Sequence, residues 1–335
     1  MEIVDGRKAR WAHNYAVTIF LSETGLTGSA QLTCQITPAH MSAMIFNFGS
    51  INVDHVYRVA AMPSPGETLT AGSYQKLLGG KGINQSIAIA RAGQAPVHIG
   101  SLGSDDSWTM EQVKNFGIDT ALIAQSAHPT GHAVIYVDDA GENQIVIFGG
   151  ANQDLKPAQI EEAFKTCAGA DHWVLVQNET NLLADIVDQA KSAGFKVAYS
   201  AAPFVADTVA ELIDKIDLLA VNEVEAEATA RLLGVAVSEI AVPQLLITRG
   251  SKGVEFHSHG EVHNQPAFRV EAVDTTGAGD TFLGSFLAHH CYGVEIAQSL
   301  RYASAASALQ VTRPGAAVAI PAREEVETFL KQRKA

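Results

Sequence analysis

Cysteine is scarce in this chain, which has only Cys34, Cys167 and Cys291 among its 335 residues. The three lie far apart and form no C-x-x-C pair, so they exclude a disulfide framework and a structural zinc site of the usual spacing. The zinc-protease pattern H-E-x-x-H is absent as well, although the chain has 12 histidines. Few, scattered cysteines are typical of a reducing compartment, and we expect the protein to be cytoplasmic.

Basic residues and long apolar runs are also in short supply. Asp and Glu number 36 against 23 Lys and Arg, which gives a net charge of −13. An acidic chain of this kind argues against nucleic acids and anionic membranes as partners. No apolar run approaches the roughly 18 residues that a membrane-spanning helix needs, so we expect no membrane segment.

Two common nucleotide-binding fingerprints are missing. The turn 79–82 fails the P-loop pattern because Gly82, rather than Ser or Thr, follows the lysine. No G-x-G-x-x-G follows the first expected strand, and the pair Gly277 and Gly279 lacks a third glycine at Phe282. The second absence argues against a nicotinamide-dependent oxidoreductase.

One short motif indicates anion chemistry instead. The segment 274–280 reads Asp-Thr-Thr-Gly-Ala-Gly-Asp and runs directly into an apolar, helix-like stretch. Glycines permit a tight turn, and a helix that begins there directs its free N–H groups and positive dipole end into the turn, which suits a phosphate. Asp280, at the same place, can accept a proton from a hydroxyl group. The alternative interpretation is a plain glycine turn whose acid favours the helix dipole.

Strand-like and helix-like segments alternate through much of the second half of the chain. The expected strands are 173–177, 196–200, 218–221 and 245–248, and the expected helices are 182–193, 205–213 and 223–233. This alternation predicts an α/β fold in which helices cover both faces of a mostly parallel sheet. Ligands of such folds bind at the carboxyl ends of the strands, where nearly all of the polar candidates fall.

The first half of the chain is organised differently. We expect a buried first strand at 45–49 and a helix at 83–92. Segments 56–61, 69–78 and 131–148 do not fit the alternation and are expected to form a small separate sheet, the last of them as a hairpin.

Residues 1–43 lack clear periodicity and look unlike the remainder. We expect an N-terminal extension that is either disordered or not native, the latter with Met41 or Met44 as the functional start.

The polar candidates each have a structural interpretation beside a functional one. Lys81 and Asn84 stand in a glycine turn that opens a helix, as ordinary turn residues or as ligand donors. Asn222 and Glu225 have capping-box spacing, and the same spacing suits a site for magnesium phosphate. The segment 248–253 is a hairpin loop or a backbone wall for a nucleotide.

Two further candidates belong to the first half of the chain. Asn52 and Asp54 follow the first expected strand, as turn residues or as partners of sugar hydroxyls. Glu142 stands at the expected hairpin tip, where it is most simply a solvated charge.

The order of these motifs is more specific than any one of them. From about residue 44 to its end the chain resembles the ribokinase (PfkB-type) carbohydrate kinases, through segments 49–54, 65–68, 79–85, 222–225, 248–253, 274–280 and 311–315. The resemblance implies that residues 44–335 form a three-layer α/β/α fold with a mostly parallel sheet. Strands at about 54–78 and 131–148 would form a small β-sheet lid, through which relatives also dimerise.

The resemblance also implies roles for individual residues. Asp280 would take the proton from the primary hydroxyl of a sugar, while Gly277, Ala278 and Gly279 would form the anion hole for the transferring phosphoryl group. The residues expected to hold the sugar are Asn52, Asp54, Gly80, Lys81, Asn84, Glu142 and Asp280. The residues expected to bind ATP are Asn222, Thr248, Gly250, Gly253, Gly279 and Ser304.

Two cations are implied beside ATP. Glu225 would position Mg²⁺ through water. K⁺ would be bound at a site made by Asp274 and Thr276, by the carbonyls near Gln310, Arg313 and Gly315, and by the position of Ala319. This chain departs from the family pattern at two of these positions: Ser304 stands where some members carry a histidine against the adenine, and Ala319 replaces a serine-type potassium ligand.

The resemblance, with its Asn52-x-Asp54 start, favours D-ribose as acceptor and D-ribose 5-phosphate as product. We expect a homodimer formed through the lid. Two alternatives stay open: a kinase of the same family for another sugar or a nucleoside, and a non-catalytic sugar sensor. The intact Asp280 argues against the sensor, because a sensor needs no base.

Overall fold

The computed structural model describes residues 43–165 and 171–333 in full, and of residues 1–42 it describes four strands, β1 (Ile3–Val4), β2 (Lys8–Ala9), β3 (Tyr15–Glu23) and β4 (Ala30–Pro38). The chain divides into two compact units, Met1–Ala43 and Met44–Ala335. In the first unit β1 pairs antiparallel with β2, and β3 with β4. These strands do not test the expectation of a disordered or non-native extension, part of which falls on residues outside those described, and it stays a prediction.

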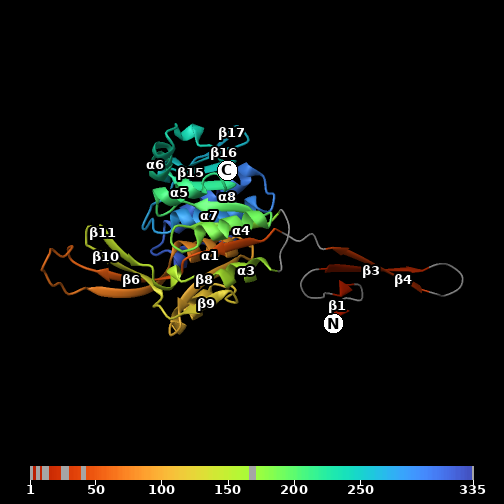
Figure 1. Cartoon of the computed structure of the whole chain (residues 1–335), viewed down its shortest axis with the longest axis horizontal. Coiled ribbons are helices and arrows are strands. Elements are labelled where there is room, and N and C mark those ends of the chain that lie inside the picture. Colours follow the sequence, from red (N-terminus) through yellow and green to blue (C-terminus); the bar gives the residue numbers. More distant parts are fainter. Residues whose placement is uncertain are drawn as a thin grey trace. The chain divides into compact units, whose positions relative to one another are not determined.

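A nine-stranded sheet forms the centre of the second unit (Figure 1), in the order β17-β16-β15-β14-β13-β12-β5-β8-β9. Seven strands run parallel: β5 (Ile45–Phe48), β8 (Val97–Gly103), β9 (Ile123–Ser126), β12 (Trp173–Gln177), β13 (Lys196–Ser200), β14 (Leu218–Asn222) and β15 (Gln244–Thr248). At one edge β16 (Val254–Ser258) and β17 (Glu261–Gln265) add antiparallel. The predicted, mostly parallel sheet is confirmed.

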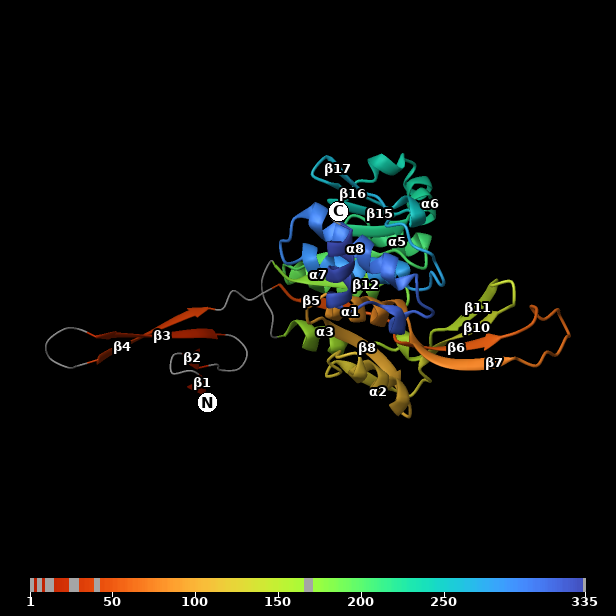
Figure 2. The ribbon, with the colours of Figure 1, turned by 180° about the vertical axis from the view of Figure 1, so that it is seen from behind.

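Helices cover both faces of this sheet. Successive strand residues point to opposite sides, and both sets are apolar, so each face needs a covering layer. Phe46 and Phe48 of β5 pack in the core under α3 (Pro157–Phe164), α4 (Leu183–Ser192), α5 (Ala206–Leu212) and α6 (Glu223–Leu233). Ile45 packs in the opposite core, under α1 (Lys81–Arg91), α7 (Ala278–His290), α8 (Ile296–Gln310) and α9 (Arg323–Gln332). Figure 2 shows the second set from behind. The expected three layers, α/β/α, are confirmed.

The remaining helices are short. They are α2 (Ser107–Asn115) and the 3₁₀ turns η1 (Gly150–Gln153), η2 (Val237–Glu239), η3 (Gly250–Lys252) and η4 (Ala317–Ala319). Among the residues that the structure describes, no helix has both the length and the apolar character needed to cross a membrane.

A second sheet of four strands, the small sheet, has the order β11-β10-β6-β7. Its strands are β6 (Asn52–Arg58), β7 (Ser73–Gly79), β10 (Gly131–Val137) and β11 (Asn143–Phe148). The predicted hairpin is confirmed, with Ala133 opposite Ile147. The early strands differ from expectation: β6 begins at Asn52, because Asn52 pairs with Gly79 on one side and Gly131 on the other. Asn52 and Asp54 are therefore strand residues rather than turn residues.

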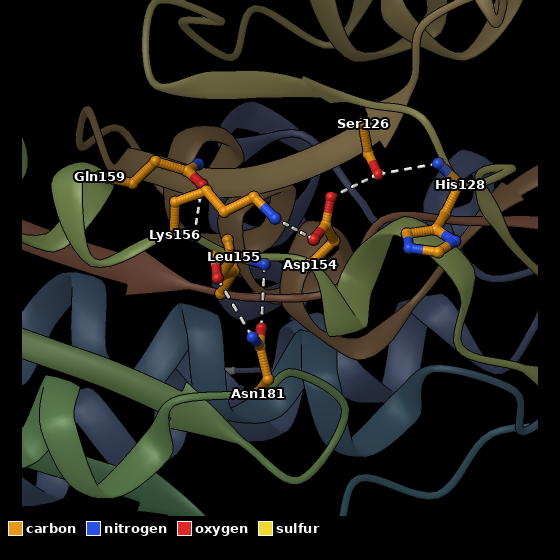
Figure 3. A network of polar contacts seen from close by, with 7 residues as sticks. All are labelled: Ser126, His128, Asp154, Leu155, Lys156, Gln159 and Asn181. Carbon is orange, nitrogen blue, oxygen red and sulfur yellow. Dashed lines mark hydrogen bonds and ion pairs between the residues drawn. The ribbon is translucent and has the colours of Figure 1, made fainter.

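The segment that returns from the small sheet is fixed by polar contacts (Figure 3). The Leu155 amide donates to Asn181 Oδ1 at 2.9 Å, and Asn181 Nδ2 donates to the Leu155 carbonyl at 3.1 Å. Ser126 Oγ, at the end of β9, donates to Asp154 Oδ2 at 2.7 Å. These contacts hold η1 in place, and η1 carries Asn152 to the first residue of β6.

Candidate active site

The polar candidates converge where the carboxyl ends of β5, β12, β14 and β15 meet the first turns of α1, α6 and α7. Two hollows adjoin there, with volumes of about 580 and 180 Å³. Both are lined by Thr248, Thr275, Ala278 and Gly279, so the turn before α7 forms the wall between them. The smaller hollow also contains Lys81 and Asp280. A group bound in one hollow can thus reach a group bound in the other past the N-terminus of α7.

Asp280 is the third residue of α7, and its position follows from the turn before it. Gly277 is the N-cap, with a φ of 75° that favours glycine. Asp280 Oδ1 accepts from Gln85 Nε2 at 2.9 Å, and Oδ2 accepts from Asn84 Nδ2 at 3.3 Å. The surrounding protein atoms raise the pKa of Asp280, whereas Lys81 and the two amides counteract that rise. The carboxylate is thereby made more basic while it stays aimed into the smaller hollow.

A buried chain of amides fixes the direction of the Gln85 donor. Gln177, the last residue of β12, donates through Nε2 to Gln85 Oε1 at 2.8 Å and to Asn47 Oδ1 at 2.8 Å. Because Gln85 Oε1 is occupied in this way, its Nε2 must face Asp280. Asn47 Nδ2 is itself held by the Gly82 carbonyl at 2.7 Å and by Ser86 Oγ at 2.8 Å. The Asp280 carboxylate is thus oriented, through Gln85, by residues of the sheet that lie outside both hollows.

Lys81 and Glu179 place opposite charges beside Asp280. Asp280 raises the pKa of Lys81, burial lowers it, and Glu179 and Glu225 raise it further, with a net rise. Glu179 Oε2 accepts from the Lys81 amide at 3.0 Å and from Ser50 Oγ. Lys81 therefore stays protonated and is suited to a ligand oxygen that carries negative charge.

The groups expected to hold a sugar lie on the small sheet and on α1. Asn52 Oδ1 accepts from Asn152 Nδ2 at 2.6 Å. Burial, with a smaller contribution from Glu179, raises the pKa of Asp54 to about 6. Asn84 is buried, and its Oδ1 has no hydrogen-bond partner among the described residues. Buried polar atoms are normally paired, so Asn84 Oδ1 indicates an acceptor that a ligand hydroxyl completes.

Two glycines are required by the close packing of the α1 turn. A Cβ on Gly82 would lie 2.3 Å from the Gly49 Cα atom. Gly80 has a φ of 100°, and a Cβ there would lie 2.9 Å from the Asn52 amide nitrogen. The glycine turn therefore packs directly on the loop after β5 and brings α1 close to β6.

The larger hollow contains most of the residues expected to bind the nucleotide. Thr248, Gly250, Gly253, Gly279 and Ser304 line it. Gly253 has a φ of 102°, and a Cβ there would lie 2.2 Å from the Gln265 carbonyl oxygen. Phe268 and Phe282 supply apolar walls. A mostly apolar hollow that ends at a helix N-terminus suits a flat ring followed by phosphates.

Asn222 and Glu225 form the capping box that their spacing predicts. Asn222 Oδ1 accepts from the Glu225 amide at 2.9 Å, and Glu225 Oε2 accepts from the Asn222 amide at 2.8 Å. Both residues also line the smaller hollow. Burial raises the pKa of Glu225, partly offset by Asn222 and Lys81. No cluster of three metal-binding side chains occurs in the described part of the chain, so a metal here would need phosphate oxygens and water as further ligands.

The six residues expected around potassium divide into two groups. Asp274, Thr276, Gln310 and Gly315 are brought together: Asp274 Oδ1 accepts from the Thr276 amide at 2.9 Å and Oδ2 from the Gly315 amide at 2.8 Å. Gln310 Nε2 donates to the carbonyls of both Thr276 and Gly315. The guanidinium of Arg313 pairs with Glu325 of α9, so Arg313 could contribute only its backbone carbonyl, as the resemblance implies. Ala319 is buried in η4 and has no side-chain oxygen to offer.

Glu142 is the sugar-site candidate that the structure leaves apart. It is exposed at the tip between β10 and β11, where its amide donates to Asp138 Oδ1 at 3.0 Å. No described contact joins its carboxylate to the other candidates.

Sequence reasoning missed Glu179, Gln177 and Asn47. All three stand at or near the carboxyl ends of strands β12 and β5, as the other candidates do. A polar residue inside an apolar strand, as in Trp173–Gln177, was the available signal. These side chains are joined to each other, to Lys81 and to Gln85 by contacts between residues 92 to 130 positions apart, and the sequence pattern does not contain that information.

Comparisons with known proteins agree with this geometry. The family model for pfkB family carbohydrate kinases matches residues 42–323. The ribokinase of Haemophilus influenzae is 38% identical over 303 residues, which cover 84% of this chain and 97% of that protein. A ribokinase structure from Thermotoga maritima matches with a TM-score of 0.77 at 33% identity, over 87% of this chain and 100% of its own. The Arabidopsis thaliana ribokinase, solved with ribose and ATP, gives 0.74 at 30% identity, over 87% and 99%.

Proposed function

Because the chain belongs to the pfkB family of carbohydrate kinases, we propose that it phosphorylates the 5-hydroxyl of D-ribose with ATP and releases D-ribose 5-phosphate and ADP. It is a phosphotransferase that acts on an alcohol group of a sugar. The observation that carries the proposal is Asp280, which lies at the helix N-terminus between the two adjoining hollows, one suited to a nucleotide and one polar.

The chemistry follows from the residues around Asp280. The sugar hydroxyl attacks the γ-phosphorus, the bond to the β,γ-bridging oxygen breaks, and Asp280 takes the hydroxyl proton. The turn Gly277, Ala278 and Gly279 is proposed to stabilise the charge that develops on the phosphoryl group through its backbone N–H groups, of which that of Ala278 is donated to the Thr275 carbonyl in this structure, and Lys81 adds a positive charge. Asp280 needs no separate activation, because the raised pKa already favours acceptance of a proton.

The sugar is proposed to lie against Asn52, Asp54, Gly80, Lys81 and Asn84. The free Oδ1 of Asn84 and the carboxylate of Asp54 are acceptors for two ring hydroxyls. Glu142 is proposed to reach the sugar when the small sheet closes as a lid, which would also exclude water from the phosphoryl group.

ATP is proposed to occupy the larger hollow, with its base toward Ser304 and its phosphates at Gly279. The proposed further contacts of ATP are with Asn222, Thr248, Gly250 and Gly253. Bound Mg²⁺ neutralises phosphate charge in reactions of this class. Glu225 fits a water-mediated contact to such an ion, because one of its oxygens is committed to the capping box and the carboxylate still lines the phosphate end.

Potassium was the second expected cation. The residues expected to hold it do not fit an ion in this conformation. The side-chain nitrogen of Gln310 already occupies the space between the carbonyl oxygens of Thr276, Gly315 and Ala316. No step of the proposed reaction depends on that ion.

A homodimer through the small sheet is the proposed assembly. Ile145, Val146, Ile147 and Phe148 of β11 are between 50% and 67% exposed, and Tyr74 of β7 is 49% exposed. An exposed apolar surface of this kind suits a second copy. The reaction is proposed to take place in the cytoplasm, where ATP is available and the cysteines stay reduced.

An ADP-release assay with ATP and Mg²⁺ over a panel of acceptors tests the function. The panel contains ribose, deoxyribose, fructose, fructose 6-phosphate and adenosine. A preference for ribose in kcat/KM is expected. Preference for another acceptor would retain the kinase and reject ribose, and no turnover of any acceptor, with ATP hydrolysis also absent, would favour a sensor.

A further inference from the structure

Gln310, the last residue of α8, is fully buried behind the anion-binding turn. Its Nε2 donates to three backbone carbonyls: Thr276 at 3.0 Å, Gly315 at 3.0 Å and Ala316 at 3.1 Å. One of these carbonyls comes from the turn before α7, and two come from the loop after α8. A single side-chain nitrogen therefore joins the two segments directly beneath Gly277.

Three carbonyls around one amide nitrogen is an unusual arrangement. A primary amide has two N–H bonds, so three acceptors at nearly equal distance share two hydrogens. Carbonyl oxygens that converge on one point are the arrangement with which proteins coordinate a dehydrated monovalent cation. The nitrogen of Gln310 thus occupies the position at which such a cation would sit.

The neighbouring acid is satisfied without an ion. Both oxygens of Asp274 accept backbone N–H groups, from Thr276 and from Gly315. The charge of Asp274 is therefore already stabilised by dipoles of the same two segments that Gln310 joins.

Gln310 also reaches the residues on both sides of the base. Its Oε1 accepts from Thr281 Oγ1 at 3.3 Å, one residue after Asp280, while its Nε2 binds the carbonyl of Thr276, before the glycine turn. A Cβ on Gly277 would lie 3.7 Å from Gln310 Nε2. The amide therefore supports the whole turn that carries the anion hole and the base.

We propose that the side chain of Gln310 replaces a bound monovalent cation in this protein. The amide holds the Thr276–Gly277 turn in the geometry that phosphoryl transfer needs, so turnover is independent of potassium. We call the three carbonyls of Thr276, Gly315 and Ala316 around Gln310 Nε2 the cradle. The inference rests on the proposed kinase function where activity is measured, and on the geometry of the cradle alone where ion binding is measured.

The first experiment uses the unmodified full chain. ADP release with ribose, ATP and Mg²⁺ is measured in potassium, sodium and choline chloride at equal ionic strength. The three rates are expected to agree within about twofold. At equal ionic strength the three salts screen charges to nearly the same extent, so only a specifically bound cation would separate the rates. Thermal melting is measured in the same salts without substrates, and equal melting temperatures are expected, because an ion that bound the native state would raise that temperature.

The second experiment opens the cradle with Gln310→Ala. Removal of the amide takes the side-chain donor from the carbonyls of Thr276, Gly315 and Ala316, of which Ala316 keeps the Ala319 amide as a donor, and creates space for an ion. In choline chloride the variant is expected to turn over about tenfold more slowly than the unmodified protein. The loss of the hydrogen-bond donor is expected to destabilise the turn by an amount that corresponds to about one factor of ten in rate. Potassium is expected to restore most of the rate and to raise the melting temperature of this variant alone. Thr312→Ala, two residues on and outside the cradle, is the matched control and should behave like the unmodified chain in every salt.

Several results would overturn the inference. They are activation of the unmodified protein by about tenfold in potassium, a melting temperature of that protein raised specifically by potassium, or full activity of Gln310→Ala in choline chloride. If Gln310→Ala does not fold, the salt series on the unmodified protein still decides. If ribose is not the acceptor, the rates with ribose are zero in every salt, but the melting temperatures in the three salts can still be compared. Failure of the proposed function is thereby distinguishable from failure of this inference.

Discussion

The two sides of Asp280 are built differently. On the side of α1 and the small sheet, Asn84 Oδ1 has no partner among the described residues and burial raises the pKa of Asp54. On the opposite side, Gln310 Nε2 and both oxygens of Asp274 are hydrogen-bonded to backbone, and Gln310 Oε1 accepts from Thr281. Unmet polar groups lower stability, so they persist where a ligand completes them. The front of the site is prepared for a ligand, and the back keeps the turn rigid.

The largest effect is expected from Asp280→Asn, which removes the base and keeps the shape. Turnover should fall by about 10³-fold, within the range for a lost general base. The affinity for ATP should change little, because the larger hollow and the helix N-terminus remain. Single-turnover phosphorylation of ribose and ATP binding by calorimetry measure the two quantities.

A matched control for that variant is Asp185→Asn, which makes the same change in the first turn of α4. It should leave turnover unchanged. If Asp280→Asn lost ATP binding instead of turnover, Asp280 would belong to the nucleotide side. The raised pKa of Asp280 gives a second expectation: the rate of the unmodified enzyme should fall on acidification, with a midpoint above the ordinary aspartate range.

An intermediate effect is expected from Gln177→Glu, which lies in neither hollow. A carboxylate cannot donate to Gln85 Oε1, so Gln85 should turn its N–H toward residue 177 and its carbonyl toward Asp280. The loss of a donor and the added charge should raise the pKa of Asp280 and move the acidic limb of the kcat profile to higher pH. A rate loss of about tenfold at neutral pH is expected from one lost charge-assisted hydrogen bond.

The control for Gln177→Glu is Gln298→Glu, the same change at an exposed position of α8. A rate loss in Gln177→Glu without displacement of the pH profile would indicate a general packing defect and would contradict the positioning role.

The smallest effect concerns stability. The pKa of Asp54 is about 6 in the folded chain against 3.8 as the ordinary value, so the folded state binds the proton more tightly. Stability therefore falls as pH rises from about 4 to 6, and the ionised carboxylate destabilises the fold near neutrality. Asp54→Asn should stabilise the protein on the order of 1 kcal/mol near pH 7 and have little effect below about pH 4.

Chemical denaturation at the two pH values measures this difference, and the KM for ribose should rise in the same variant. Equal free energies of unfolding for the unmodified protein and Asp54→Asn at both pH values would show that the Asp54 carboxylate is well solvated and is not one of the buried groups prepared for a ligand.

Local patterns predicted the main sheet well because its strands are buried on both faces. Trp173–Gln177 and Lys196–Ser200 have the predicted bounds, as does the helix Glu223–Leu233. Each is a short apolar run or a capped helix whose limits depend on neighbouring residues. The glycine turn before Asp280 was predicted for the same reason, since φ above zero at Gly277 is a local requirement.

The small sheet and the polar contacts were harder to predict. β6 begins at Asn52 because Gly79 and Gly131 pair with it, and these partners are distant in the chain. The Gln177–Gln85 contact likewise joins residues 92 positions apart. Gln310 illustrates the limit: the resemblance placed it at a cation site, but the conformation of its side chain decides whether an ion has room there.

The exposed strand β11 has a consequence for handling the protein. It forms an edge of the small sheet, and Gln144–Phe148 is an uncharged run of high β-propensity with unpaired backbone groups along one side. Such a segment can template the stacking of further chains in solution. A single charge at Val146 would be expected to suppress aggregation, whereas concentration or removal of any covering partner would promote it. The same strand is thus both a surface suited to assembly and a site at which aggregation can start.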